Sequence, residues 1–133
     1  MSTKQIDQAV LARYREYQQI YERVYETNDP TPLRAIAMDP LLTIITNDVR
    51  KISAKGEIWR FHNVLNPKIQ GRSKDGGIVA VIDCVRTLGA YRFSATTGER
   101  LGAWRGGTYL YQAVMRFSDG AWKISEARQG KKC

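Results

Sequence analysis

Two alternating runs joined by an Asp-Gly turn, over residues 109–127, constrain the fold of this chain more than any other segment. In the first run, every second residue from Tyr109 to Phe117 is tyrosine, alanine, methionine or phenylalanine. In the second run, Trp122 and Ile124 alternate with polar residues. Asp-Gly between alternating runs is the strongest short-range signal for a β-hairpin. The segment therefore predicts an antiparallel hairpin with one core-facing side, which the rest of the chain must cover.

A long amphipathic helix is predicted over residues 4–28, because apolar side chains recur there at steps of three and four residues. Ser2 or Thr3 can cap its start, and the sequence Asn28-Asp29-Pro30 ends it. Aromatic residues at helical spacing usually pack on a sheet. We therefore expect the four tyrosines of this segment to lie on a sheet with their hydroxyls at its rim.

Two shorter helices are predicted next. The first covers residues 33–38, with Pro32 suited to its first position. The second has Asp39 as its N-cap, an apolar stripe from Leu41 to Ile52 and Gly56 at its end.

The remaining sequence indicates strands. Residues 58–69 alternate until Pro67, which implies an edge strand or a bulge. Residues 78–85 are continuously apolar except at Asp83, which predicts a central strand, and residues 91–93 begin another β segment. Helices followed by strands, without βαβ alternation, define the α+β class. We expect one domain, residues 1–133, in which the long helix crosses the concave face of a bent antiparallel sheet.

Basic residues exceed acidic ones, with a formal net charge of +8, and residues 91–133 hold eight basic and three acidic residues. This charge suits an acidic protein partner or a cell-envelope polyanion. Apart from adjacent pairs such as Lys131-Lys132, the basic residues are scattered along the chain and match no nucleic-acid-binding motif, so no nucleic acid is expected as a partner. No apolar run approaches the ~20 residues of a membrane-spanning helix, so no transmembrane segment is expected.

The two cysteines allow two interpretations. Cys84 lies in the apolar strand and Cys133 is the last residue, so they could be a buried thiol and a terminal thiol. Alternatively they form a disulfide, which would stabilise the fold by about 4 kcal/mol in the chain-entropy model. A disulfide would place the protein in an extracytoplasmic or cell-surface location, whereas free thiols would fit the cytoplasm.

The order of predicted elements resembles the nuclear-transport-factor-2-like cone, the superfamily that includes ketosteroid isomerase and limonene-epoxide hydrolase. More narrowly, Asp83-Cys84, Thr97-Gly98 and residues 114–124, with a cysteine closing the chain, resemble small actinobacterial extracytoplasmic proteins of this fold, many of them lipoproteins. The resemblance implies a cystatin-like α+β cone and supports pairing of Cys84 with Cys133. It also implies dimerisation through the exposed sheet face, which is common in domains of this fold.

Asp83 is the main candidate for chemistry, because a carboxylate inside an apolar strand needs a partner or water. By analogy with the isomerases, it could be a general base, with Tyr14 or Tyr17 as an oxyanion donor. His62, the only histidine, is expected on the surface of the sheet or at a strand end, and a catalytic role is its alternative. The structural alternative for Asp83 is an ion pair with a strand arginine, Arg86 or Arg116. Strand alternation puts Asp83 inside the cone only if Cys84 lies outside.

The sequence therefore predicts a non-catalytic interaction or scaffold domain of an exported or cell-surface protein, which binds another protein or forms a homodimer. The alternative is a small-ligand binder, or an isomerase- or hydrolase-type enzyme that uses Asp83 and tyrosines. An open cavity containing Asp83 would favour chemistry, and a filled interior would exclude it. The sequence has no metal-ligand or phosphate-loop motif, so neither a metal nor another cofactor is expected.

Overall fold

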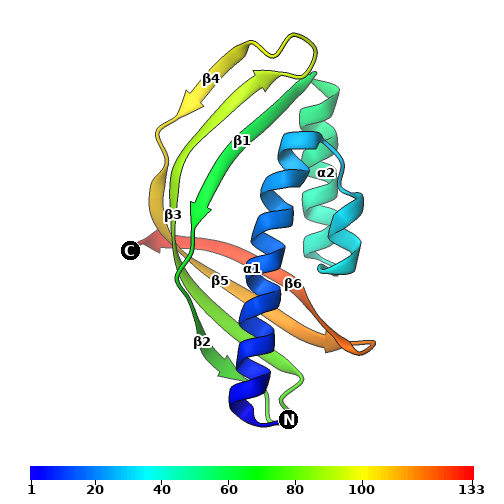
Figure 1. Cartoon of the computed structure of the whole chain (residues 1–133), viewed down its shortest axis with the longest axis vertical. Coiled ribbons are helices and arrows are strands. Elements are labelled where there is room, and N and C mark those ends of the chain that lie inside the picture. Colours follow the sequence, from blue (N-terminus) through cyan, green and yellow to red (C-terminus); the bar gives the residue numbers. More distant parts are fainter.

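The computed structural model describes all residues 1–133 and contains two α-helices, one short 3-10 helix and six strands. The helices come first and lie to one side of a single bent antiparallel sheet (Figure 1). This is the predicted α+β architecture. The helices are α1 (Thr3–Thr27), η1 (Thr31–Ala35) and α2 (Leu41–Ala54). The strands are β1 (Glu57–Val64), β2 (Pro67–Arg72), β3 (Ile78–Ser94), β4 (Arg100–Trp104), β5 (Gly107–Ser118) and β6 (Ala121–Lys132).

Local sequence sets the ends of α1. Ser2 accepts a hydrogen bond from the Gln5 backbone, and the Gln5 side chain accepts one from the Ser2 backbone, which completes a capping box. At the other end Asn28 adopts the left-handed conformation that commonly ends helices. Both ends agree with the sequence prediction.

The two shorter helices differ in detail from their predicted bounds. The 3-10 helix ends at Ala35, earlier than expected, because Ala37 joins β6 in a short parallel bridge with Ile124. Helix α2 begins at Leu41, and Asp39 still satisfies its first turn by accepting a hydrogen bond from the Thr43 backbone at 2.9 Å.

Strand β3 organises the sheet, because β1 and β2 pair along one of its edges and β4 and β5 along the other. The expectation of a separate segment at residues 91–93 is wrong, since these residues continue β3. The strand bends where Gly89 and Ala90 are buried, and a glycine lets the chain bend there without leaving the sheet. Strand β2, which begins at Pro67, pairs only with β3 and is the predicted edge strand.

The core lies between α1, α2 and the concave face of the sheet. Val10 and Tyr14 of α1 pack there with Val79, Val81 and Met115 of the sheet, all at most 1% exposed. The long helix therefore covers the concave face as predicted, and the hairpin β5–β6 contributes Ile124 to the same core. No helix has the length and apolar character needed to span a membrane.

Candidate functional site

The wide end of the cone holds a cavity of about 650 Å³, within the range of small-molecule sites. We call it the cone cavity. Twelve of its nineteen lining residues are hydrophobic, and they come from α1, α2 and the upper part of the sheet. The residues that line it are Tyr17, Gln18, Tyr21, Tyr25, Leu41, Ile44, Ile45, Asn47, Asp48, Lys51, Phe61, Asn63, Val85, Thr87, Ala90, Trp104, Tyr111, Ala127 and Gln129.

Three tyrosines of α1 form one wall of the cone cavity. The rings of Tyr17 and Tyr21 lie 5.7 Å apart and those of Tyr21 and Tyr25 5.0 Å apart, at angles typical of aromatic packing. Burial raises the pKa of Tyr17 well above its usual value and raises the pKa of Tyr21 to about 12. The hydroxyls of Tyr17 and Tyr21 therefore keep their protons at physiological pH and are available as hydrogen-bond donors to a ligand.

Asp83 points into the cone but does not reach the cone cavity. It is 1% exposed, accepts a hydrogen bond from the Tyr14 hydroxyl at 2.7 Å and accepts another from the Asn66 backbone at 2.6 Å. Neither Asp83 nor Tyr14 lines the cavity. The ion pair considered as an alternative, with Arg86 or Arg116, does not form, since both carboxylate oxygens are engaged elsewhere.

Tyr14 is held as a donor to this carboxylate. Burial is the largest cause that raises its pKa, and the hydrogen bond to Asp83 adds to it. The proton of Tyr14 therefore stays on its oxygen and points at Asp83, away from the cone cavity.

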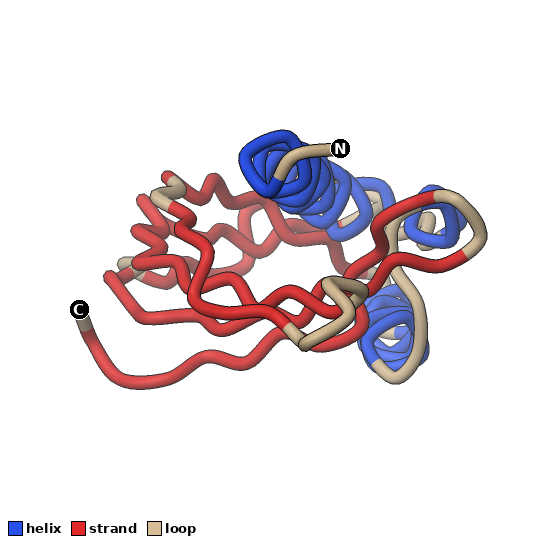
Figure 2. Tube along the Cα trace, turned by 90° about the horizontal axis from the view of Figure 1, so that it is seen from below, coloured by secondary structure: helices blue, strands red, loops and turns tan.

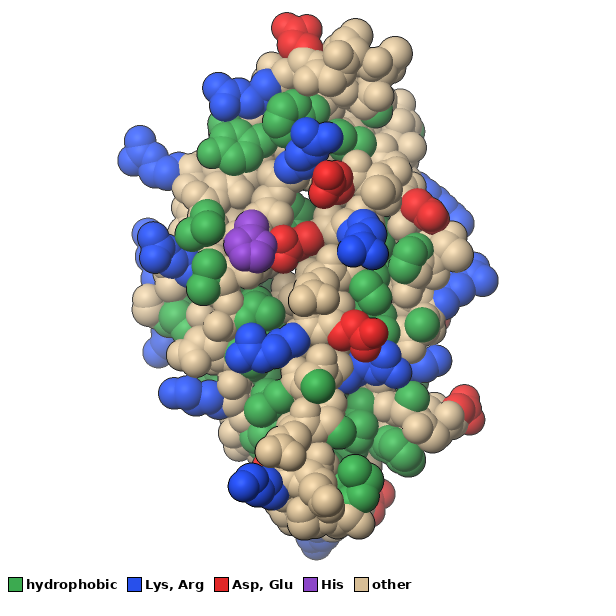
Figure 3. All heavy atoms as spheres, in the orientation of Figure 1, with side chains coloured by type: hydrophobic (Ala, Val, Ile, Leu, Met, Phe, Trp, Pro, Cys, Tyr) green, Lys and Arg blue, Asp and Glu red, His purple; other side chains and the backbone are tan.

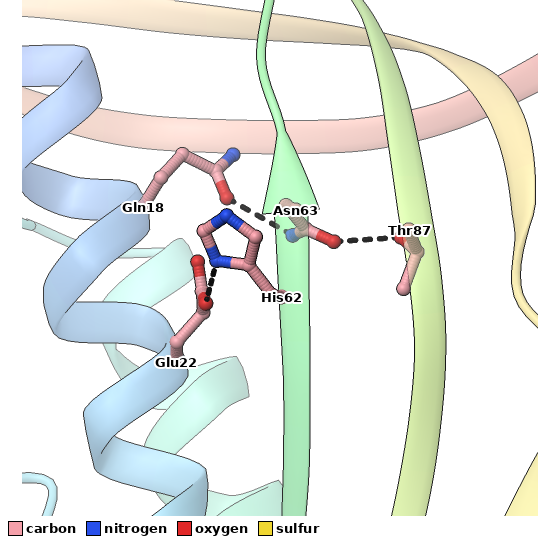
Figure 4. A network of polar contacts seen from close by, with 5 residues as sticks. All are labelled: Gln18, Glu22, His62, Asn63 and Thr87. Atoms are coloured by element: carbon pink, nitrogen blue, oxygen red, sulfur yellow. Dashed lines mark hydrogen bonds and ion pairs between the residues drawn. The ribbon is translucent and has the colours of Figure 1, made fainter.

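A chain of side-chain hydrogen bonds continues from Tyr14 to the cavity wall. Gln18 donates to the Tyr14 hydroxyl at 3.1 Å. Gln18 also accepts from Asn63 at 3.3 Å, and Asn63 accepts from Thr87 at 2.6 Å (Figure 4). Gln18, Asn63 and Thr87 line the cone cavity. Asp83 therefore anchors a polar network whose far members face the cavity.

His62 lies outside this network. Its side chain is 67% exposed and its Nδ1 lies 3.0 Å from Glu22 of α1. Figure 4 shows the ring on the side of β1 next to the helix, and Figure 3 shows the only histidine, in purple, on the surface beside an acidic side chain. His62 does not line the cavity, so the structure places it at the surface.

The only charged side chains that line the cone cavity are on α2. Asp48 accepts a hydrogen bond from Tyr25 at 2.6 Å, and Lys51 lies nearly one turn further along the helix. Burial and the neighbouring Tyr21 raise the pKa of Tyr25, and Asp48 raises it further. Next to Asp48 and Lys51 the rim of the cavity is apolar. It carries the exposed side chains of Ile44 and Trp104, which are 60% and 45% exposed.

Cys84 and Cys133 form a disulfide on the outer face of the sheet. Cys84 belongs to β3 and Cys133 follows β6, so the bridge crosses the intervening strand β5. Alternation along β3 then turns Asp83 inward, which is the direction predicted from the sequence for this pairing.

The sequence marked Asp83, Tyr14 and Tyr17 as candidates for chemistry, but it did not mark the other polar residues of the network and the cavity. Gln18, Asn63 and Thr87 are uncharged and far apart in sequence, and no local pattern connects them. From the sequence alone, Asp48 belongs to the solvated face of α2. It follows the buried Ile45 by three residues, however, and this spacing makes the two side chains neighbours on the helix surface. No group of three histidine, cysteine, aspartate or glutamate side chains is close enough to bind a metal ion.

Comparisons with solved structures identify the fold. The intermembrane space region of the chloroplast protein ARC6 superposes with a TM-score of 0.77 at 16% identity, covering 99% of this chain and 98% of that chain. A proposed scytalone dehydratase from Novosphingobium aromaticivorans gives 0.62 at 16% identity, covering 98% and 91%. A protein with a cystatin-like fold from Caulobacter vibrioides gives 0.54 at 11% identity, covering 93% and 90%. No protein-family model and no curated protein matches the sequence.

The chain therefore has the cystatin-like α+β fold that the sequence resemblance implied. At these identities the similarity concerns the fold alone. The narrower resemblance to actinobacterial extracytoplasmic proteins stays a prediction.

Proposed function

We propose that this protein is a non-catalytic binding domain whose cone cavity takes an uncharged small molecule with an apolar, preferably aromatic, body and an acceptor oxygen. The observation that carries this proposal is the open cavity of about 650 Å³, lined mainly by hydrophobic residues and tyrosines. Cavities of this size and character are typical of small-molecule sites.

The placement of Asp83 supports binding over catalysis. A general base must reach the proton that it abstracts, directly or through one water. Asp83 is 1% exposed, both of its oxygens accept internal hydrogen bonds and it does not line the cavity. The deeper polar groups at the cavity wall, Gln18, Asn63 and Thr87, carry no charge and do not titrate.

Tyr17 supports an acceptor oxygen on the ligand. Its side chain lines the cavity, is 3% exposed and makes no hydrogen bond within the chain. The Tyr17 hydroxyl is not a fully buried, unpaired atom, so it is open to the cavity and can donate to a ligand oxygen there. A ligand carboxylate would lose its hydration in the cavity and would find no buried cation to compensate, because Lys51 lies at the exposed rim.

The test compares two fluorescent or titratable probes with the same ring, acetylnaphthalene and naphthoate. We expect acetylnaphthalene to bind and naphthoate to bind at least about tenfold more weakly, because an unpaired anion would be buried. Tyr17→Phe should weaken acetylnaphthalene by about fivefold, the value of one neutral hydrogen bond. The control is Tyr91→Phe, which removes a hydroxyl from a tyrosine that is 40% exposed and does not line the cavity. Equal affinity for the two probes, or no binding of either, contradicts the proposal.

Protein association is the second candidate function, and the uncovered outer face of the sheet favours it. In this view the domain acts outside the reducing cytosol, in an exported or cell-surface protein, because the Cys84–Cys133 disulfide persists in oxidising compartments. The similarity to the intermembrane space region of ARC6 concerns the fold and adds no partner. Sedimentation and partner binding test this second function, as described next.

A further inference from the structure

The convex side of the sheet, which we call the outer sheet face, is not covered by any helix. Seen from below, the helices lie above and to the right of the strands, and the opposite side of the sheet is bare (Figure 2). Cys84 lies on this side because Asp83 points inward. Strand pairing aligns Lys68, Ile82, Gln112 and Arg128 in one row across four strands, one step along the sheet from Cys84.

Positive charge dominates the outer sheet face. In addition to Lys68 and Arg128, pairing places Arg116 and Lys123 beside Ile78 in another row of this face.

One further cation and one carboxylate lie in or next to these rows. Arg86 follows Cys84 by two residues and shares its side of β3. Glu126, paired with Val114, is the single carboxylate in these rows. Its 3.9 Å contact with Arg128 is solvent-exposed and neutralises little of the charge.

Apolar side chains fill the middle of the face between these cations. Ile82 stands between Lys68 and Gln112, Ala80 pairs with Val114, and Leu110 pairs with Cys84. Ile78 is 37% exposed. An apolar centre surrounded by charged residues is the usual anatomy of a protein–protein interface.

We propose that the outer sheet face binds an acidic segment of another protein, one that presents apolar side chains between its carboxylates. This inference rests on protein association, the second candidate function, and does not involve the cone cavity. A nucleic acid would neutralise the cations but would leave the apolar centre facing a polar backbone.

A second copy of the chain is excluded as the preferred occupant by charge. In a two-fold dimer the same surface patch lies on both subunits, so the two sets of five cations would face each other. Like charges placed opposite each other in an interface cost several kcal/mol, and one carboxylate per subunit does not balance them. The predicted homodimer through this face is therefore not the arrangement that we propose.

The experiment measures fluorescence anisotropy of three labelled probes at low salt. The probes are a peptide of alternating valine and glutamate, a polyglutamate peptide of the same charge and a short DNA duplex. We expect the alternating peptide to bind most tightly, because only this peptide offers apolar groups to the centre of the face. Analytical ultracentrifugation of the same samples should show a monomer.

The variant K68E/R128E reverses two exposed charges of the face, and K4E/K55E reverses two exposed charges elsewhere, with the same change in net charge. We expect K68E/R128E to weaken the alternating peptide by at least about tenfold and K4E/K55E to weaken it by less than about threefold. Acetylnaphthalene affinity should be unchanged in both variants, which shows that they remain folded.

Several results would overturn the inference. Equal weakening by both variants, or tighter binding of DNA than of the alternating peptide, would show charge attraction without a protein site. A wild-type dimer that dissociates in K68E/R128E would retain protein association but make a second copy the occupant. A monomer that binds none of the three probes would overturn both the acidic partner and the second candidate function, while the acetylnaphthalene assay still judges the cavity.

Discussion

Removing one oxygen atom, by Tyr14→Phe, should destabilise this protein far more than the same change at the neighbouring Tyr17. Tyr14 is 1% exposed, donates to Asp83 at 2.7 Å and accepts from Gln18 at 3.1 Å. A hydrogen bond to a charged group contributes about 1.5–3 kcal/mol, and a neutral one about 1 kcal/mol. We therefore expect the free energy of unfolding to fall by about 3 kcal/mol in Tyr14→Phe.

Tyr17→Phe is the matched control. The Tyr17 hydroxyl makes no hydrogen bond within the chain, so its removal should change the free energy of unfolding by less than about 0.5 kcal/mol. Urea denaturation followed by tryptophan fluorescence measures both variants under non-reducing conditions. The midpoint of Tyr14→Phe should fall while the slope stays unchanged. A loss below about 1 kcal/mol in Tyr14→Phe would refute the view that Asp83 is a buried structural anchor.

A double-mutant cycle extends the test to the carboxylate itself. Asp83→Asn keeps the size of the side chain but replaces one acceptor oxygen by a donor, which conflicts with Tyr14 or with the Asn66 backbone. We expect Tyr14→Phe and Asp83→Asn to be strongly non-additive, with a coupling energy above about 1 kcal/mol. An Asp83→Asn variant of unchanged stability would instead revive the general-base hypothesis.

Two further perturbations have calculable outcomes. Replacing both disulfide cysteines in C84S/C133S opens a bridge of sequence separation 49 and should lower the free energy of unfolding by about 4 kcal/mol, measured by urea denaturation against wild type with and without reductant. Raising the pH should destabilise the fold, because tyrosines of the unfolded chain ionise near pH 10, whereas the pKa values of the four tyrosines of α1 are raised in the folded state. Their stabilising contribution is complete below about pH 10 and is lost above it, so a free energy of unfolding that stays constant between about pH 9 and 11, while phenolate absorbance reports ionisation, would contradict these shifts.

The fold could be predicted from the sequence where local chemistry determines it. The Asp-Gly turn between alternating runs fixed the hairpin, and apolar periodicity with Ser2 and Asn28 fixed the long helix. The length of β3 could not be predicted, because Gly89 continues the strand only when β1 and β4 pair with its upper half. The length of β3 therefore depends on pairing between segments that are distant in the sequence.

The candidate site, too, could be predicted only in part from the sequence. Alternation along β3 predicted that Asp83 points inward once Cys84 is known to bond to Cys133, and helical spacing placed Tyr14 on the stripe that packs above it. The distance of Asp83 from the cavity could not be predicted. The carboxylate is held in the core by Asn66, which is 17 positions away in the sequence. The Asn66 backbone N–H donates to the carboxylate oxygen that does not accept from Tyr14.

Asp83 marks the level at which the cone changes from a filled core to an open cavity. On the same face of β3, Val79 and Val81 precede it and are fully buried in the core, whereas Val85 and Thr87 follow it and line the cone cavity. A carboxylate at this level lets an apolar core end against a polar network without leaving buried groups unpaired. The hydrogen-bond network that begins at Asp83 thus also reaches the wall of the cavity, which would explain why a residue with the appearance of a catalytic base occurs in the binding domain that we propose.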